Sequence, residues 1–295
     1  MTAQGTPDAE VEIDEELLRC LLVDQMPEYA SLEIAFLDTG WDNISFRLGE
    51  ALVIRMPRRQ TAAPLLENEQ RWLPTLAKRL PIPIPAPIAV GGPGHGYPWN
   101  WSLLPWIPGQ SANPDPLDSD QAPRLANFLA ALHQPAPSDA PQNMYRCGPL
   151  ASREEATVLR MNRIREATDQ ITPDVEAAWR SALDAPEADE STWVHGDLHA
   201  RNVLVENGHL AGIIDWGDMT SGDGAVDLAA AWMLFESAEV RKQVLSSYGA
   251  CPNMCRRAFG WAVFSGVLLL DTGLVDNPQH AAMGKATLRR ITEDG

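Results

Sequence analysis

The residues with the clearest chemical potential lie in segment 195–202, His-Gly-Asp-Leu-His-Ala-Arg-Asn, and in segment 213–218, Ile-Ile-Asp-Trp-Gly-Asp. They supply a carboxylate at Asp197, an amide at Asn202 and a second carboxylate at Asp215. Two oxygen ligands beside a separate carboxylate suit a hard divalent cation next to a general base. Phosphoryl transfer requires this combination, because positive charge must neutralise the phosphates and a carboxylate must receive a hydroxyl proton.

The elements that must position these residues are two short strands joined by a tight turn. Segments 203–205 and 210–214 are apolar, and Glu-Asn-Gly-His stands between them, a pattern that predicts a β-hairpin. Asn202 precedes the first strand and Asp215 follows the second. We therefore expect both side chains to lie in one region near Asp197.

Strands dominate the N-terminal part of the chain, and the first three in series suggest an antiparallel meander. One helix is predicted from Glu15 and another over 65–80, where Pro74 interrupts the helical pattern. The proline-rich segment 81–87 favours an extended connector. The predicted strands are 32–37, 43–48, 51–56, 88–90 and 99–104.

From Ala122 onwards the apolar periodicity is helical except at the hairpin. A chain of 295 residues exceeds the usual size of a single core, so we expect two domains, 1–106 and 107–295. The predicted fold class is α+β, with a small antiparallel-sheet N-terminal lobe and a larger helical C-terminal lobe. The predicted C-terminal helices are 122–132, 152–167, 173–183, 226–236, 238–248, 255–270 and 278–292.

The net charge of −17, from 23 basic and 40 acidic residues, argues against nucleic acid and anionic membranes as partners, since both require basic surfaces. The same charge would attract a polycationic small molecule. Taken alone, the charge favours the simpler interpretation, a solvated acidic surface that keeps the protein soluble.

Nothing in the sequence predicts a membrane or secreted protein. No apolar run approaches the roughly 20 residues that span a bilayer, and the best candidate, 262–270, reads as a buried helix. Segment 1–16 is acidic and lacks the features of a signal peptide. The four cysteines read as free thiols in a cytoplasmic protein, although Cys251 and Cys255 could instead bind a metal.

With segment 195–215 in this layout, the chain resembles the aminoglycoside phosphotransferase family, which has the protein-kinase-like fold. The match is to the family's His-Gly-Asp-x-x-x-x-Asn and Ile-Asp-Trp/Phe patterns. The resemblance implies that Asp197 is the catalytic residue that orients the acceptor hydroxyl and can take its proton. It further implies that Asn202 and Asp215 hold Mg²⁺ and that His195 is a scaffold residue. His199 could face the acceptor or the solvent.

The family also has a phosphate-binding cation on a strand, and Val-Ile-Arg-Met places Arg55 there, where protein kinases have lysine. Arginine keeps the charge and offers a planar fork to phosphate oxygens. Arg58 or Arg59 could make this contact instead. The helix partner of Arg55 would be Glu69, with Glu67 as the competitor.

The resemblance implies two further parts of a nucleotide site for ATP or GTP. Only Gly40 remains of a glycine-rich phosphate loop, where backbone N–H groups or the side chain of Asn43 could reach a phosphate. Segment 103–109 matches the family's hinge, where the carbonyl of Pro105 and the N–H of Ile107 would hold the base.

Segment 222–229 matches a family pattern, Gly-Asp-Pro-Ala-x-Asp-Leu-Ala, with Gly224 in place of the proline and with Asp227 bracing the catalytic loop. The resemblance therefore implies a kinase that uses Mg²⁺ and ATP or GTP to phosphorylate a hydroxyl of an antibiotic-like or sugar-like acceptor. An aminoglycoside is favoured. Macrolides, choline, homoserine and metabolic sugars are the alternative acceptors, and an inactive kinase-fold binding protein is the alternative function. The absence of a long activation segment disfavours a protein kinase.

Overall fold

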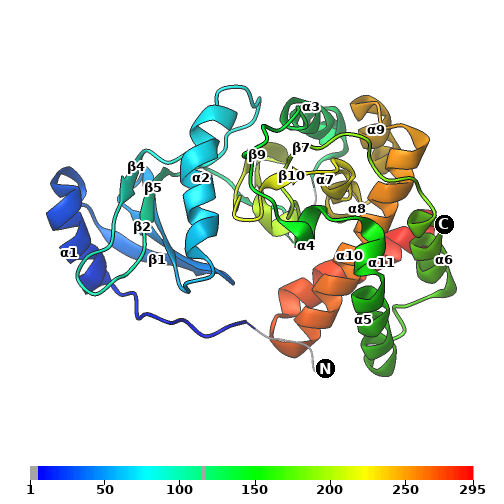
Figure 1. Cartoon of the computed structure of the whole chain (residues 1–295), viewed down its shortest axis with the longest axis horizontal. Helices are drawn as coiled ribbons and strands as arrows, with labels where there is room; N and C mark the ends of the chain where they lie inside the picture. Colours follow the sequence, from blue (N-terminus) through cyan, green and yellow to red (C-terminus); the bar gives the residue numbers. More distant parts are fainter. Residues whose placement is uncertain (1–5, 114–116, 295) are drawn as a thin grey trace. The chain divides into compact units, whose positions relative to one another are not determined.

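The computed structural model describes residues 6–113 and 117–294, so residues 1–5 of the acidic N-terminal segment lie outside the described part. The chain forms two compact units, Thr6–Pro108 and Gly109–Gly295 (Figure 1). The N-terminal unit is built on an antiparallel sheet, and the C-terminal unit is mainly helical. The predicted α+β class, with a sheet lobe followed by a helical lobe, is confirmed.

The sheet of the N-terminal unit has five antiparallel strands in the order β1-β2-β3-β5-β4. The predicted meander is therefore correct. Its first strand starts at Ile34 rather than at Leu32, because the N–H of Leu32 donates to the carbonyl of Tyr29 and closes a turn. The strands are β1 (Ile34–Thr39), β2 (Asn43–Leu48), β3 (Leu52–Pro57), β4 (Ala89–Gly91) and β5 (Trp101–Pro105).

Two helices accompany this sheet, α1 (Glu15–Gln25) and α2 (Ala63–Leu76). The carboxylate of Asp14 caps α1 by accepting from the N–H of Leu17 (2.8 Å), and the leucines of α1 enter the core of the unit. Helix α2 continues through Pro74 and stops earlier than predicted.

The helices of the C-terminal unit pack around α10, which contacts α5, α6, α7 and α11. The predicted helix 226–236 is wrong as a single helix. It divides at Ala229, where the N–H of Trp232 donates to the carbonyl of Ala229 and tightens the turn. The helices are α3 (Ala122–Leu132), α4 (Met144–Cys147), α5 (Glu154–Ala167), α6 (Pro173–Leu183), α7 (Ala225–Leu228), α8 (Ala230–Leu234), α9 (Ala238–Tyr248), α10 (Pro252–Asp276) and α11 (Pro278–Asp294).

The predicted hairpin is present as β8 (Val203–Glu206) and β9 (His209–Ile213). Its turn consists of Asn207 and Gly208, both at positive φ (53° and 81°), which is the geometry that Asn-Gly favours. Sequence periodicity did not reveal three very short strands. Of these, β6 (Gln110–Ser111) pairs with β8, and β7 (Thr192–Val194) pairs with β10 (Thr220–Gly222).

Helix α10 is longer than the predicted helix 255–270, because Pro252 begins it at a position where no N–H is needed. By length and composition alone it could cross a membrane, since its most apolar window has a mean hydropathy of 1.7. That window is 67% buried inside the protein. We therefore interpret α10 as a core helix, as its apolar stretch predicted.

Helices α10 and α11 approach closely at Gly284. A Cβ atom there would lie 2.5 Å from the backbone nitrogen of Leu270 and 2.7 Å from the carbonyl oxygen of Gly266. Backbone atoms of a core helix cannot yield as a flexible side chain can. We predict that Gly284→Ala lowers the free energy of unfolding by about 1–3 kcal/mol, although alanine is the better helix former.

Urea denaturation would measure this change. Lys285→Ala, at the neighbouring exposed position of α11, is the matched control and should change stability by less than about 0.5 kcal/mol. Equal stability of Gly284→Ala and the wild type would contradict the close approach of the two helices.

Candidate active site

The loop between β7 and β8 is fixed to the end of β9 through His195. The N–H of Asp197 donates to Nδ1 of His195 (3.2 Å), and Nε2 of His195 lies 3.0 Å from the carbonyl oxygen of Ile214. Because the carbonyl of Ile214 can only accept, Nε2 must carry a hydrogen. Because the N–H of Asp197 can only donate, Nδ1 must carry none, so the imidazole is the neutral Nε2–H tautomer. The His195 ring is completely buried and packs edge-on against Trp216.

Asp227 holds the same loop from the other side. Its carboxylate accepts from the N–H of His195 (2.7 Å) and the N–H of Gly196 (2.9 Å), and it lies 3.2 Å from Nε2 of His133. Burial raises the pKa of Asp227, but the hydrogen bonds from His133 and His195 outweigh burial and place the pKa below its ordinary value. Asp227 is therefore a buried anion that fixes the loop backbone.

Glycine is required at Gly196 and Gly224 for two different reasons. Gly196 has φ +83°, and a Cβ there would lie 2.6 Å from the carbonyl oxygen of Asp218. At Gly224 a Cβ would lie 2.6 Å from Nδ1 of His133, which also bonds the hydroxyl of Tyr248 (2.9 Å). The departure from the family's proline at Gly224 thus makes room for the histidine that supports Asp227.

The hairpin brings Asn202 and Asp215 into the same region as Asp197. The side-chain Nδ2 of Asn202 donates to the carbonyl oxygen of Asp197 (2.9 Å), and the N–H of Ile214 donates to the carbonyl of Asn202 (2.9 Å). Asp215 follows directly and has φ +61°, a conformation that is uncommon outside glycine and often found at functional sites.

The donors in this region fit Mg²⁺. The amide nitrogen of Asn202 donates to Asp197, so its side-chain oxygen is the atom that could bind a metal, and the residue Asp215 is exposed. Mg²⁺ typically takes one or two protein carboxylates and completes its shell with phosphates and water. Within residues 6–113 and 117–294, no group of three or more His, Cys, Asp or Glu could hold a metal without such help. All four cysteines are free thiols, and a Cys251–Cys255 metal site gains no support.

Two nitrogen-bearing side chains, those of Arg146 and His199, lie against the carboxylate of Asp197. Nη2 of Arg146 lies 3.1 Å from its Oδ1, and Nε2 of His199 lies 3.5 Å from its Oδ2. Burial raises the pKa of Asp197, but Arg146 and then His199 reverse this effect and hold the pKa well below its usual range. Arg146 could not be recognised from the sequence, because it belongs to the four-residue helix α4 and approaches Asp197 only in the tertiary fold.

His199 and Arg201 both face neighbours within the fold. The His199 ring lies 6.3 Å from the ring of His280, and Nη1 of Arg201 lies 3.1 Å from Nε2 of His280. Burial, together with the neighbouring His199 and Arg201 side chains, lowers the pKa of His280 to about 4. His280 is therefore neutral near pH 7 and can accept the hydrogen bond from Arg201.

In the N-terminal unit, the ion pair to Arg55 comes from Glu69. Nη2 of Arg55 lies 3.3 Å from Oε1 of Glu69, whose side chain is 3% exposed. Glu67 instead accepts from Nδ2 of Asn100 (3.1 Å) at the surface. The structure therefore places the helix α2 carboxylate against the β3 arginine at the predicted position.

The other two arginines stabilise the loop between β1 and β2. Nη1 of Arg58 donates to the carbonyl of Gly40 (2.8 Å), and Arg59 forms an ion pair with Asp42. Asn43 accepts from the N–H of Gly40 through its backbone carbonyl (2.8 Å), and its side-chain oxygen is buried with no hydrogen-bond partner among the described residues. The loop thus has a defined conformation and keeps hydrogen-bonding capacity at Asn43.

The predicted hinge segment begins where β5 ends. Pro105 pairs with Leu52, and the N–H of Trp106 donates to the carbonyl of Ala51 (2.7 Å). The guanidinium of Arg47 stacks 3.7 Å over the Trp106 ring. These contacts anchor the backbone that carries Pro105 and the buried Ile107.

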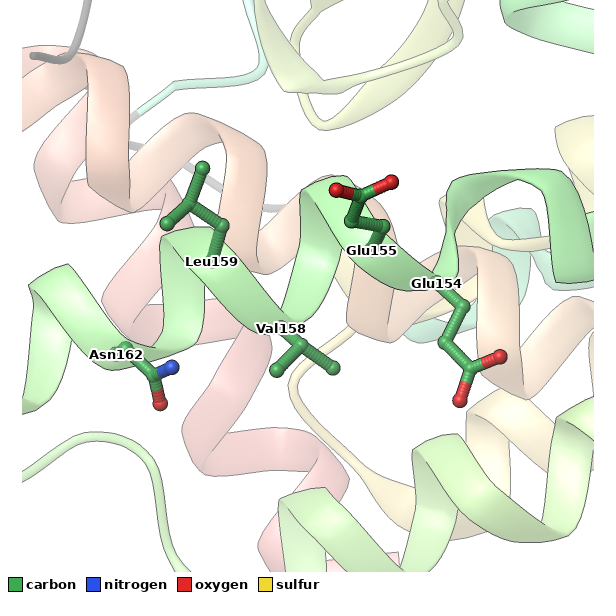
Figure 2. Close-up of a pocket in the computed structure, with 5 residues that line it drawn as sticks. All are labelled: Glu154, Glu155, Val158, Leu159 and Asn162. Carbon is green, nitrogen blue, oxygen red and sulfur yellow. The ribbon is translucent and has the colours of Figure 1, made fainter. Parts of the chain in front are cut away.

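A pocket of about 440 Å³ on α5 lies apart from these residues. Figure 2 shows its lining side chains, all of which project from this one helix. No residue of segment 195–202 or 213–218 lines it, so we do not include the pocket in the candidate active site. The lining residues are Glu154, Glu155, Val158, Leu159 and Asn162.

Comparison with known proteins identifies the family. The model of the phosphotransferase enzyme family matches residues 33–264. Among solved structures, the chain is similar to an aminoglycoside 2'-phosphotransferase-IIIa in complex with GDP, with 18% identity and a TM-score of 0.67 over 96% of this chain and 99% of that one.

Two macrolide phosphotransferases are similar as well. The macrolide 2'-phosphotransferase of Brachybacterium faecium shares 20% identity, with a TM-score of 0.59 over 93% of this chain and 98% of that one. A macrolide 2'-phosphotransferase type I shares 24% identity, with a TM-score of 0.60 over 96% and 99%. These likenesses show the kinase-like fold, and the family match covers most of the chain. The chain therefore belongs to the phosphotransferase enzyme family that includes the aminoglycoside phosphotransferases.

Proposed function

We propose that this phosphotransferase is a small-molecule kinase, which transfers the γ-phosphoryl group of ATP or GTP to a hydroxyl of an antibiotic-like or sugar-like acceptor. The observation that carries the proposal is the set of hydrogen bonds that joins Asn202 to Asp197 on one side and to Ile214, the residue before Asp215, on the other. Related structures support a nucleotide donor, since one contains GDP, another GDP and kanamycin, and a third ADP. The expected cytoplasmic location stays a prediction.

In the proposed mechanism, the carboxylate of Asp197 accepts a hydrogen bond from the acceptor hydroxyl and orients its oxygen towards the γ-phosphorus. The bond from this oxygen to phosphorus forms as the bond to the nucleotide's leaving oxygen breaks, and the hydroxyl proton passes to Asp197. The low pKa of Asp197 makes it a weak base. A weak base suits a loose transition state, in which the proton moves late and positioning supplies most of the rate.

Asn202 and Asp215 are the residues that would hold Mg²⁺, which when bound neutralises phosphate charge. The buried amide of Asn202 also braces Asp197, so metal ligation and acceptor orientation depend on the same side chain.

The N-terminal unit is proposed to contact the nucleotide through residues that the family resemblance assigns. Arg55, fixed by Glu69, would contact the phosphates, and Asn43 would add a polar contact from its loop. The carbonyl of Pro105 and the N–H of Ile107 would bind the base. The observed ion pair and the anchored hinge backbone support these assignments.

An aminoglycoside is the first acceptor to test and a macrolide the second. Both classes are named for similar structures, but the identities of 18% to 24% do not select between them. Nucleotide consumption with Mg²⁺ should be measured for ATP and GTP across aminoglycosides, macrolides, choline, homoserine and simple sugars. Turnover with one class supports the proposal and names the acceptor. No binding of either Mg-nucleotide would contradict it and favour a binding protein.

The first mutational prediction concerns the catalytic carboxylate. Asp197→Ala should lower kcat by about 10³-fold or more, because it removes the carboxylate proposed to orient and deprotonate the acceptor hydroxyl. Nucleotide affinity and Tm should stay close to wild type, since Arg146 remains paired with Asp218.

Steady-state kinetics, calorimetric nucleotide titration and thermal unfolding would check these values. Asp189→Ala, at an exposed position outside the loop, is the control and should behave as wild type. Full activity of Asp197→Ala would end the proposed mechanism.

A second prediction concerns the metal. Asp215→Asn keeps a side chain that tolerates positive φ and removes the negative charge. We expect Mg²⁺ to strengthen nucleotide binding to the wild type, and this gain should fall by about tenfold or more in the variant, or about 1.4 kcal/mol. Calorimetric titrations with and without Mg²⁺ would measure the gain. An unchanged gain would mean that Asp215 is not a ligand.

A further inference from the structure

The backbone around Asp197 is fixed, whereas its side chain depends on another part of the fold. His195 and Asn202 hold the backbone N–H and carbonyl of Asp197, and Asp227 holds the preceding residues. None of these bonds restricts rotation of the carboxylate. The nearest side-chain partner of Asp197 is Arg146, at 3.1 Å from its Oδ1.

Arg146 is shared between two carboxylates. Its Nη2 lies between Oδ1 of Asp197 (3.1 Å) and Oδ2 of Asp218 (2.7 Å), and its Nε donates to the same Oδ2 of Asp218 (2.9 Å). Two anions this close repel each other unless a cation lies between them. Because the guanidinium is planar and binds Asp218 through two nitrogens, its orientation towards Asp197 is defined as well.

Asp218 and α4 are themselves fixed by Asn143. Nδ2 of Asn143 donates to Oδ1 of Asp218 (2.8 Å), and its Oδ1 accepts from the N–H of Tyr145 at the start of α4 (3.1 Å). The backbone N–H of Asn143 donates to the hydroxyl of Thr220 on β10 (2.9 Å). A closed set of bonds therefore connects α4, β10 and the carboxylate pair, and Arg146 cannot move without breaking it.

The catalytic loop is shaped to admit this arginine. A Cβ at Gly196 would lie 3.3 Å from Cβ of Arg146, in addition to its clash with the carbonyl of Asp218. The side chain of Arg146 is 18% exposed, and those of Asp197 and Asp218 are each 25% exposed. The three charged groups thus form a mostly buried cluster whose edge reaches solvent at the carboxylate that the mechanism uses.

We propose that Arg146 is a positioning residue for phosphoryl transfer, which holds the carboxylate of Asp197 in the orientation that receives the acceptor hydroxyl, with Asp218 and Asn143 holding Arg146. The inference rests on the proposed function for Asp197. Arg146 touches neither the nucleotide nor the metal ligands in this scheme. Its loss should therefore reduce kcat and leave the KM of the nucleotide unchanged.

The test compares Arg146→Met and Arg146→Lys with Arg153→Met. Arg153 stacks on Tyr145 in the same segment and donates to the carbonyl of Met144, but it makes no contact with Asp197. With the acceptor that the wild type phosphorylates, Arg146→Met should lower kcat by about 100-fold, the effect expected of a reacting group misplaced by about 1 Å. Arg146→Lys keeps the charge without the fork and should be intermediate. Arg153→Met should match the wild type.

Chemical rescue separates positioning from a merely structural role. Arg146→Ala should regain kcat when guanidinium chloride is added at concentrations well below those that unfold the protein. Urea, which has a similar shape but no charge, should not restore it. Equal kcat for Arg146→Met and Arg153→Met, or a loss of kcat that guanidinium does not reverse, would overturn the proposal.

A crystal structure of Arg146→Met would test the positioning of the Asp197 carboxylate independently of any activity measurement. We expect the carboxylate of Asp197 to rotate away from Asp218 while Asn202 and Asp215 keep their positions. An unmoved carboxylate would overturn the positioning role. Failure of the wild type to turn over any acceptor would count against the proposed function alone, and a rotated carboxylate in the variant would still support the role of Arg146. If Arg146→Met does not fold, the same comparison is made with Arg146→Lys.

Discussion

The buried carboxylate of Asp227 is the constraint on which the active-site loop depends. It accepts the N–H groups of His195 and Gly196, two consecutive backbone donors that would otherwise be buried without partners. An uncompensated anion in this position would cost several kcal/mol, and the contacts from His133 and the loop offset that cost. The loop and its anchor therefore stabilise each other, and neither has this conformation alone.

This arrangement places two glycines where side chains cannot fit. Gly196 lets the catalytic loop pass against Asp218, and Gly224 lets α7 begin against His133. The close approaches are what bring His195, Arg146 and Asp227 within hydrogen-bonding range of one short segment. The chemistry of Asp197 thus depends on backbone shape supplied by residues that carry no functional group.

The predictable parts of this protein are those whose signal is local. The Asn207–Gly208 turn requires positive φ at both positions, so the hairpin could be recognised from the sequence. The meander followed from alternating strands, and the Arg55–Glu69 pair from a strand and a helix matched to a family pattern. In each case a few neighbouring residues contain the information.

The parts that could not be predicted depend on distant partners. Strands β6, β7 and β10 are too short to show an alternating apolar pattern. They form because β6 pairs with β8 and because β7 and β10 pair with each other. Helix α4 has four residues and no apolar face that a periodicity search would find. Arg146 therefore gave no signal in the sequence, although it is the nearest side-chain cation to Asp197. Tertiary contact, rather than local propensity, decides such positions.

The same distinction applies to the net charge of −17. It suggested a polycationic acceptor, yet many carboxylates of the C-terminal unit already have arginine partners, as Asp223 has Arg257 and Asp294 has Arg241. Asp197 itself is paired with Arg146. An ammonium group on an acceptor would have to compete with that guanidinium at short range. Carboxylates about a Debye length or more away attract the ammonium group only weakly, because salt screens the interaction. The charges next to Asp197 therefore bear more on acceptor choice than the acidity of the whole chain.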